Sequence, residues 1–311
     1  MKSYLIRRIL YVIPIVLGVA LIIFALFHLV GGDPTYQMLG KHASQTQVDQ
    51  LRHELGFDQP LVTQFVNYLR QIITFDYGRS YISKQKISEM IASGIGPSLS
   101  LAVPAFLVET LLAIVIALFV SFFRGGILDR TIMFFCVVGM SISSLAFILF
   151  GQYVFAYWLG LFPVSGYDYD LFERFRYIIL PALIWVIVGL GLNVRVFRTF
   201  MLDEIGQDYI RTARAKGLSE ISVLFRHVLP NAMIPVVTYV VIEIPFLITG
   251  SFLLESFFGI PGLGSITIEA IHNSDFPVIK AMTTLETLLF IFGNLATDVL
   301  YTVVDPRVRL N

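Results

Sequence analysis

The feature that most limits the possible folds is a set of six long apolar runs in which charged residues are rare. A helix needs about 20 apolar residues to cross a hydrocarbon core about 30 Å thick. Six segments approach or exceed that length, and they are residues 9–30, 98–123, 131–161, 177–194, 229–258 and 281–304. The sequence therefore predicts an all-α integral membrane protein with six transmembrane helices.

Composition supports a surface that faces lipid. The chain of 311 residues is 56% hydrophobic and only 14% charged, whereas soluble proteins carry about 25% charged residues. The net charge is zero, which argues against nucleic acid as the main partner. Membrane lipid is the partner that this composition predicts.

The residue types that usually carry chemistry are sparse. The one cysteine, Cys136, lies inside an apolar run, so it builds neither a disulfide framework nor a thiolate metal site. No group of His, Asp and Glu has the spacing of metal ligands, and no nucleophile and base stand together. We expect no metal site and no catalytic residue, so the chain is not predicted to be an enzyme.

The first run is expected to remain in the protein. Lys2, Arg7 and Arg8 give it a basic start like that of a secretory signal. The apolar run is too long for a signal peptide, however, and it ends in "HLVGGDP" without a small-x-small cleavage site.

The distribution of Lys and Arg in the short loops predicts the orientation. With the N-terminus in the cytoplasm, the short outside loops hold only Arg174, Arg176 and Lys280. The loop 31–97 is too long to count. The inside segments hold Lys2, Arg7, Arg8, Arg124, Arg130, Arg195, Arg198, Arg211, Arg214, Lys216, Arg226, Arg307 and Arg309. Both termini are therefore predicted to be cytoplasmic.

These spans suggest two regions. Residues 1–97 would form the first transmembrane helix and an extracytoplasmic loop, in which 47–55 and 60–73 are amphipathic. Residues 98–311 would form a core of five helices, with a cytoplasmic segment at 203–228.

The segment 203–228 has the pattern of two helices joined by a tight turn. Asp208 is placed to cap the first helix, Gly217 can end it in the left-handed conformation, and Ser219 can cap the second with Glu220 in its first turn. One apolar stripe is expected, made of Ile205, Tyr209, Ala213, Gly217, Ile221, Leu224 and Val228. The basic residues Arg211, Arg214, Lys216 and Arg226 lie off it.

Two interpretations of this segment compete. It is either an amphipathic helix resting on anionic lipid or a docking element for another protein. The glycine turn argues against the first, because a helix that lies on lipid is normally continuous.

Residues 211–235, "RTARAKGLSEISVLFRHVLPNAMIP", resemble the cytoplasmic signature of ABC-importer permeases. That signature is Glu-Ala-Ala, three residues, Gly, nine residues, Ile, one residue and Leu-Pro. Ala213, Gly217, Leu229 and Pro230 match it. Arg211 and Thr212 replace Glu-Ala, and His227 replaces Ile; these departures resemble the dipeptide and oligopeptide branch of the family.

Other segments resemble that branch in the same order along the chain. They are "RRILYVIPIVLGV", "GGDP", "GFDQPLVTQF" (56–65), "FDYGRS" (75–80), "FFGIPGLG" (257–264) and "VDPRVR" (304–309). The resemblance therefore runs from one end of the chain to the other.

The resemblance implies a type I ABC-importer permease of the bacterial inner membrane. It implies that a coupling segment seats in a groove of an ATPase subunit, through Arg211, Thr212, Ala213, Lys216, Gly217, Leu218, Ser219, Leu229 and Pro230. It also implies an outer gate that includes Pro261, Gly262 and Gly264.

The same resemblance implies partners. They are a homologous second permease, two ATPase chains and an extracytoplasmic substrate-binding protein. ATP and Mg²⁺ would bind to the ATPases, and no cofactor to this chain. In agreement, the sequence has no G-x-x-x-x-G-K-[S/T] loop.

Ionisable residues inside the spans are candidates for the translocation path, because burying them in a membrane is costly. Glu109, Glu243 and Glu286 would either meet the ammonium or amide groups of a peptide, or form hydrogen bonds between helices. Asp298 is expected to be structural. Pro230, Pro235 and Pro245 are expected to kink the fifth span and to place it along the path.

The favoured function is an ATP-driven permease for dipeptides or oligopeptides delivered by a binding protein. A permease for nickel chelates, glutathione or another small solute is an alternative within the same family. An ion-coupled secondary carrier is the alternative from another class, supported only by the membrane carboxylates. An exporter is disfavoured, because exporters usually lack this cytoplasmic signature.

Overall fold

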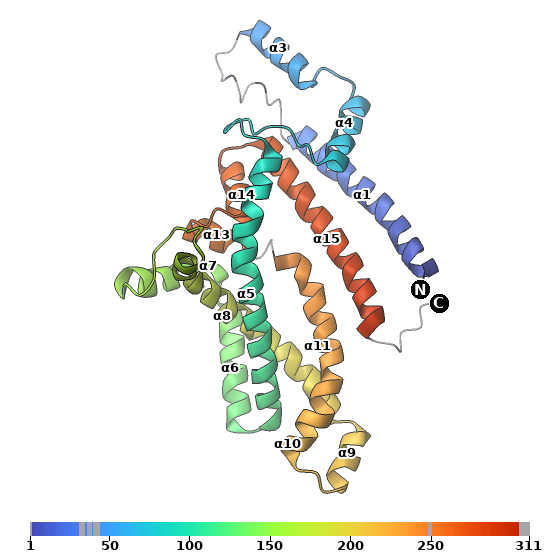
Figure 1. The fold of residues 1–311 in the computed structure, drawn as a ribbon, viewed down its shortest axis with the longest axis vertical. Coiled ribbons are helices and arrows are strands. Elements are labelled where there is room, and N and C mark those ends of the chain that lie inside the picture. The colour runs from blue at the N-terminus through green and yellow to red at the C-terminus, as the bar shows by residue number, and fades with distance from the viewer. Residues whose placement is uncertain (1, 31–34, 36–38, 40–43, 248–250, 305–311) are drawn as a thin grey trace. The chain divides into compact units, whose positions relative to one another are not determined.

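Every regular element in the part of the chain that the structure describes is a helix (Figure 1). The computed structural model describes residues 2–30, 35, 39, 44–247 and 251–304. The prediction of an all-α membrane protein is confirmed. The motifs at 31–34 and 305–309 and the outermost terminal residues lie outside the described residues.

The chain divides into two compact units. Unit 1 comprises residues 1–98 and 261–295, and unit 2 comprises 99–260 and 296–309. Unit 1 contains α1 (Lys2–Val30), α3 (Gln45–Leu55), α4 (Leu61–Thr74) and α14 (Leu263–His272). Two long helices, α5 (Ile87–Phe122) and α15 (Phe276–Val304), contribute to both units.

Unit 2 contains the remaining helices. They are α6 (Ile127–Ser141), α7 (Ser144–Gly151), η1 (Gln152–Trp158), α8 (Leu171–Ile205), α9 (Asp208–Ala215), α10 (Glu220–Val223), η2 (Leu224–Val228), α11 (Leu229–Glu243), η3 (Ile244–Phe246) and α13 (Phe252–Phe258).

The two helices expected in the long first loop are confirmed as α3 and α4. Ser44 and Gln47 cap α3 reciprocally, and Gly56 closes it at φ +73°. Helix α4 then packs on α1, where Phe24 meets Phe65 and Tyr68 at ring-centroid distances of 5.4 and 6.2 Å. The amphipathic pattern was sufficient to predict these elements.

A buried carboxylate organises the end of unit 1 that precedes α15. Asp275 is buried and accepts hydrogen bonds from the Ser80 hydroxyl and from the Tyr81 backbone N–H, the latter at 3.1 Å. In α5, Ser98 Oγ accepts a hydrogen bond of 2.8 Å from the Leu263 N–H. These contacts fix the segment before α5, and α5 itself, to the two ends of the segment that carries α14.

The core of unit 2 is built on α8. Helix α6 packs along it, and α11 packs on another part of it. Phe197, at the centre of this packing, is fully buried among Ala113, Ala117 and Val236. Cys136 belongs to the same cluster and is buried, as expected.

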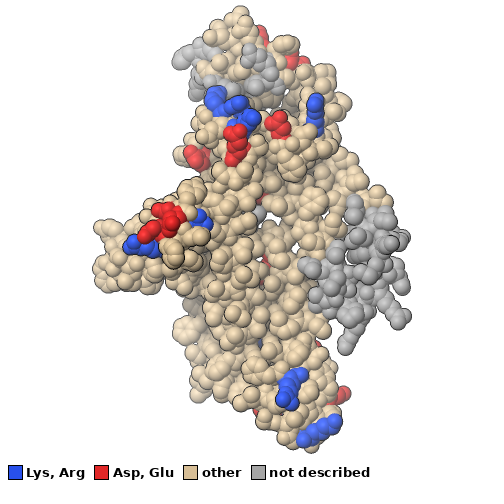
Figure 2. Space-filling view, in the orientation of Figure 1, with Lys and Arg blue, Asp and Glu red and all other residues tan. Residues whose placement is uncertain are grey.

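Within the described residues, five helices are long and apolar enough to cross a membrane, or up to six if one bent pair of helices counts as a single span. Over α5, α6 and α11, the face shown in Figure 2 is almost free of charged side chains. The expected spans begin and end inside longer helices: α5 begins before residue 98, and α8 extends past both ends of 177–194.

The expected span 131–161 is broken by a sharp bend. Helix α6 ends at Ser141, Ile142 is extended (φ −93°, ψ 133°), and the pair Ile127–Ser141 and Ser144–Trp158 is bent by 93°. The physical cause is a cluster of serines at 141, 143 and 144, whose hydroxyls compete for backbone groups. The hydroxyl of Ser141, for example, donates to the Val137 carbonyl at 2.8 Å.

The expected fifth span, 229–258, is also interrupted. Helix α11 ends at Glu243, Pro245 lies in the short η3, and α13 is a separate helix. Proline lacks the N–H that would continue the α-helical ladder. Pro235 lies inside α11, and Pro230 occupies its first turn, where a missing N–H costs nothing.

Candidate functional site

The segment 203–228 consists of two short helices joined by a left-handed turn. Gly217 has φ +80°, its N–H donates to the Arg214 carbonyl at 2.9 Å, and the N–H of Leu218 donates to the Ala213 carbonyl at 3.4 Å. This pair of bonds is the Schellman arrangement that ends a helix. The expectation that Gly217 terminates the first helix in this way is confirmed.

The caps of the two helices differ in one respect from the expectation. Ser219 caps α10 and accepts from the Ser222 N–H, as predicted. Asp208 does not cap α9: Gln207 holds the N-cap position, and Asp208 lies in the first turn. A carboxylate in the first turn still interacts favourably with the positive end of the helix dipole. The sequence therefore placed the N-cap one residue too late.

The expectation of a single apolar stripe is wrong in part. Ile210 and Val223 are fully buried although they lie off that stripe, whereas Tyr209 and Ile221 lie on it and are 39% and 63% exposed. The left-handed residue at 217 turns the chain, so the helical period before it does not continue after it.

The buried side chains hold this segment against the ends of two long helices. Ile210, Ala213 and Leu224 pack in one cluster with Leu118 of α5 and Met201 of α8. A displacement of this segment is therefore passed to α5 and α8 by direct contact.

The opposite side of the segment is exposed and carries both basic and acidic side chains (Figure 2). Arg214 is tied across the turn to Glu220 by two hydrogen bonds of 2.8 and 3.0 Å. Arg211 pairs with Asp208 at 3.2 Å, with both side chains mostly exposed. The other predicted coupling residues that the solvent reaches are Thr212, Lys216, Leu218, Ser219 and Pro230, and Leu229 is partly buried.

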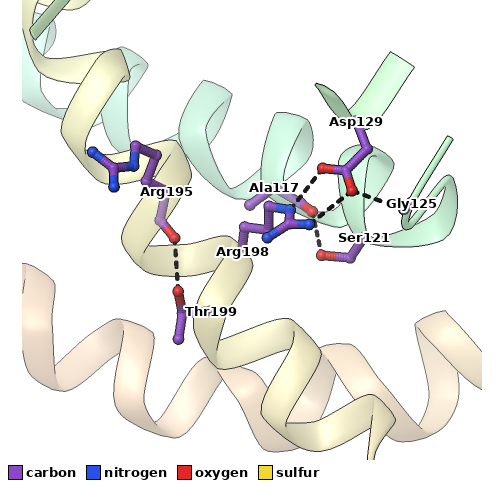
Figure 3. Close-up of polar contacts among 7 residues, drawn as sticks. All are labelled: Ala117, Ser121, Gly125, Asp129, Arg195, Arg198 and Thr199. Carbon is purple, nitrogen blue, oxygen red and sulfur yellow. Dashed lines mark hydrogen bonds and ion pairs between the residues drawn. The ribbon is translucent and has the colours of Figure 1, made fainter. Parts of the chain in front are cut away.

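An ion pair between a partly exposed arginine and a buried aspartate fixes α8 just before this segment. Arg198 donates to both oxygens of Asp129, from Nε at 2.9 Å and from Nη2 at 2.7 Å. The Gly125 N–H donates to the same carboxylate at 2.8 Å (Figure 3). Arg195, one turn earlier, points away from the pair in Figure 3.

Sequence reasoning missed this pair, because it counted Arg198 only as a basic residue in a cytoplasmic loop. The available signal was an aspartate at the third position of α6, a helix that begins directly after the two glycines at 125–126. Nothing in the sequence alone joins that aspartate to an arginine 69 positions later.

A second polar cluster lies within unit 2, among α5, α8 and α11. The Asn193 side-chain amide donates to Glu109 Oε1 at 2.6 Å and lies 3.3 Å from Glu243 Oε2. Glu109 and Asn193 are buried, whereas Glu243 is partly exposed. The structure thus brings together two of the three predicted path carboxylates through an asparagine that the sequence analysis did not single out.

The backbone leaves room for this cluster at one glycine. A Cβ atom at Gly189 would come within 2.4 Å of the Glu109 carboxyl group. Asn193 Oδ1 is buried and has no hydrogen-bond partner among the described residues. The two carboxylates therefore lie close to the Asn193 amide group, whose oxygen accepts no hydrogen bond from the described residues.

Glu286, the third predicted path residue, belongs to unit 1. It lies on α15, and its Oε1 atom is buried without a hydrogen-bond partner in the part of the chain that the structure describes. The side chain of Asp298 lies outside the described side chains.

The residues predicted for an outer gate form the entry to α14. Pro261 is exposed, Gly262 is the N-cap and Gly264 is buried. Gly94 of α5 approaches this entry closely: a Cβ there would lie 2.8 Å from Ile266 Cδ1 and 3.2 Å from the Leu263 nitrogen. The tight contact of α5 with α14 depends on that glycine.

Comparison with known proteins follows the whole length of the chain. Residues 109–310 match the sequence profile described as "Binding-protein-dependent transport system inner membrane component", and residues 1–102 match the profile of its N-terminal region. A protein of Brucella abortus named as a peptide transport system permease is 36% identical over 312 residues, 99% of each chain. A glutathione transport system permease of Salmonella typhimurium is 36% identical over 309 residues, again 99% of each chain.

The ion pair between Arg198 and Asp129 should contribute strongly to stability. Arg198→Ala leaves a buried carboxylate without its cation. That loss costs about 3–5 kcal/mol in a fully buried pair, and it should cost less here because the Arg198 side chain is 22% exposed. We expect a clearly lower midpoint of thermal denaturation in detergent. Asp129→Ala should lower it too, and the double variant should lose less than the sum of the two.

Arg195→Ala is the matched control, because Arg195 is exposed and its guanidinium donates to Met140 Sδ, at 3.4 Å, and not to a carboxylate among the described residues. It should leave the midpoint nearly unchanged. Equal effects of Arg195→Ala and Arg198→Ala would contradict a specific role for the pair.

Proposed function

The chain belongs to the family of binding-protein-dependent transport system inner membrane components, and we propose that it is the peptide-translocating permease subunit of an ATP-driven importer. Members of this family are membrane permease subunits and not enzymes. The observation that carries the proposal is the full-length likeness to permeases. It is joined by the segment at 203–228, which has one exposed side and one side packed against α5 and α8.

Short peptides are the substrate class that the relatives support best. One relative is named for peptides and another for glutathione, which is itself a tripeptide. A substrate with a peptide backbone and charged ends accounts for both names. Permeation of nickel chelates or of other small solutes stays an alternative within the family.

Three kinds of partner complete the proposed transporter. The family description already makes the system dependent on a binding protein. We infer a second, homologous permease, and two ATPase chains that bind ATP and Mg²⁺, because the sequence contains no phosphate-binding loop of its own. The chain itself would hold no cofactor.

The segment 203–228 is proposed to receive the motion of the ATPases. Its exposed face carries Arg211, Lys216 and Leu218, while its buried face rests on Leu118 and Met201. A push on the exposed face is therefore delivered to α5 and α8. The pair between Arg198 and Asp129 makes α6 follow α8, so the three helices would move together.

The cluster of Glu109, Asn193 and Glu243 is proposed to line the path. Glu243 is the partly exposed carboxylate, and Asn193 and Glu109 stand behind it. In a medium of low dielectric constant, a carboxylate held in place attracts the ammonium group of a peptide strongly. Glu286 stays a proposed path residue, and Pro261, Gly262 and Gly264 stay proposed parts of an outer gate.

The energy source tests this function against its main rival. In vesicles that hold the chain with its partner subunits and binding protein, peptide uptake should require ATP. A membrane potential or proton gradient alone should drive none. Uptake driven by a gradient without ATP would identify an ion-coupled carrier instead.

Gly217→Val should uncouple the transporter. No atom lies within 4 Å of a Cβ built at Gly217, so the substitution acts through backbone strain and not through a clash. Forcing an L-residue to φ +80° costs about 1–2 kcal/mol. We expect normal membrane insertion, loss of peptide uptake, and ATP hydrolysis that is weak or independent of substrate.

Two controls accompany this variant. Gly217→Asn should retain more uptake, because asparagine tolerates the left-handed region. Arg211→Ala should have a small effect, because an exposed ion pair contributes little. If Gly217→Val transports normally while Arg211→Ala does not, the segment rests on lipid and the docking assignment is wrong.

The proposed path makes a prediction about Glu243. Glu243→Gln removes the charge but keeps hydrogen-bonding groups, so it should lower uptake of a peptide with a free amino terminus about tenfold or more. Uptake of the N-acetylated peptide should change little. Each rate is taken relative to the unsubstituted chain, so that the preference of the binding protein cancels.

Glu109→Gln is the matched comparison, since Glu109 is buried behind Asn193. It should not distinguish the free from the acetylated peptide. An equal loss for both peptides in Glu243→Gln would assign Glu243 to helix packing and remove it from the path.

The proposed orientation is a multi-pass inner-membrane protein with both termini in the cytoplasm. Ser165 and Ser219 are both exposed, and they belong to loops predicted on opposite sides. In intact cells, a membrane-impermeant maleimide should label Ser165→Cys and not Ser219→Cys. Labelling of Ser219→Cys from outside would reverse the orientation.

A further inference from the structure

The helix α4 has an apolar stripe that stays exposed among the described residues. Val62, Val66 and Ile73 are 74%, 57% and 78% exposed. With Leu69 they follow the spacing i, i+4, i+7 and i+11, which places them on one side of a helix. These four residues are called the α4 stripe below.

The face next to this stripe is already occupied. Phe65, Tyr68, Leu69 and Ile72 pack in one cluster with residues of α1 and with Leu288 of α15. Leu69 belongs to both faces, so the α4 stripe adjoins the contact with α1. The exposed side chains of α1 include Leu17, Leu21 and Leu26, inside its membrane-spanning stretch.

The depth of α4 follows from two independent contacts. The ring of Phe24 meets Phe65 and Tyr68, and Phe24 precedes the end of α1 at Val30 by six residues. Six residues of helix correspond to about 9 Å. The contact therefore lies less than two helical turns below the end of the helix.

Lys280 of α15 indicates a similar depth in the membrane. Its ammonium lies 3.7 Å from the centre of the Tyr68 ring and 5.3 Å from that of Phe24. Lys280 follows the start of the α15 span at Phe276 by four residues. A lysine beside aromatic rings at this level is typical of the boundary between headgroups and acyl chains.

The remaining side of α4 is polar. Thr63, Asn67, Arg70 and Thr74 are exposed there, and the Thr74 hydroxyl donates to the Arg70 carbonyl at 2.8 Å. With 14 residues, α4 is about 21 Å long and cannot cross a bilayer. An apolar side, a polar side and this depth are together the properties of a helix that lies in the membrane interface.

We propose that α4 is an interfacial membrane helix, and that the α4 stripe contacts lipid acyl chains on the same side of the bilayer as the end of α1. The stripe continues the lipid-facing surface of α1, and Arg70 and Asn67 face headgroups and water. The segment between α1 and α5 is thus held down on the bilayer and does not project from it as a free loop.

Spin labels test the proposal directly. The chain has one cysteine, so single cysteines are introduced into a Cys136→Ala background at Val62, Val66 and Ile73, and at Thr63, Asn67 and Thr74 as controls. Each nitroxide-labelled chain is assembled with its partner subunits in vesicles of phosphatidylethanolamine and phosphatidylglycerol. Collision rates are measured with molecular oxygen, which enters lipid, and with a neutral nickel chelate, which stays in water.

At the three stripe positions, we expect the ratio of oxygen to nickel collisions to be several-fold higher than at the three polar positions. Labels that collide with neither reagent would show a protein partner on the stripe. Labels that collide mostly with nickel would show an aqueous surface. Either of these results would overturn the proposal. The readout does not depend on transport, so it stands or falls separately from the proposed function.

Discussion

Hydrocarbon offers no hydrogen-bond partner, and that constraint governs the placement of polar groups throughout this chain. The hydroxyls of Ser121, Ser141 and Thr238 each donate to the carbonyl four residues earlier in the same helix. Charged groups need stronger partners, and Arg198 and Asp129 satisfy each other with two hydrogen bonds. The positions where helices meet are therefore selected by polar pairing as much as by apolar packing.

Helix α8 connects the two functional regions of unit 2. Asn193, which joins two carboxylates from other helices, and Arg198, which anchors α6, are five residues apart on it, or about 7.5 Å. The same helix continues to Ile205, where the segment with Gly217 begins. A small rotation of α8 would change the geometry at all three places, because each is attached to it by direct contacts.

The sequence predicted the parts that depend on local chemistry. The apolar runs predicted membrane helices, the glycine at 217 predicted the left-handed turn, and Ser219 predicted the second cap. It failed where distant residues decide the outcome. The pairing of Asp129 with Arg198 depends on residues that are far apart in the chain. The stripe through Tyr209 and Ile221 failed for a related reason, because a periodic pattern does not survive a turn that changes the direction of the chain.

The turn at Gly217 also differs in kind from the close glycine contacts at Gly94 and Gly189. At those two positions a side chain would collide with a neighbour, so the requirement is for small volume. At Gly217 the space is empty and the requirement is for a backbone of the opposite hand. The turn between α9 and α10 is thus specified by chirality. Among amino acids that have a side chain, a D residue would favour this backbone conformation, whereas an L residue resists it.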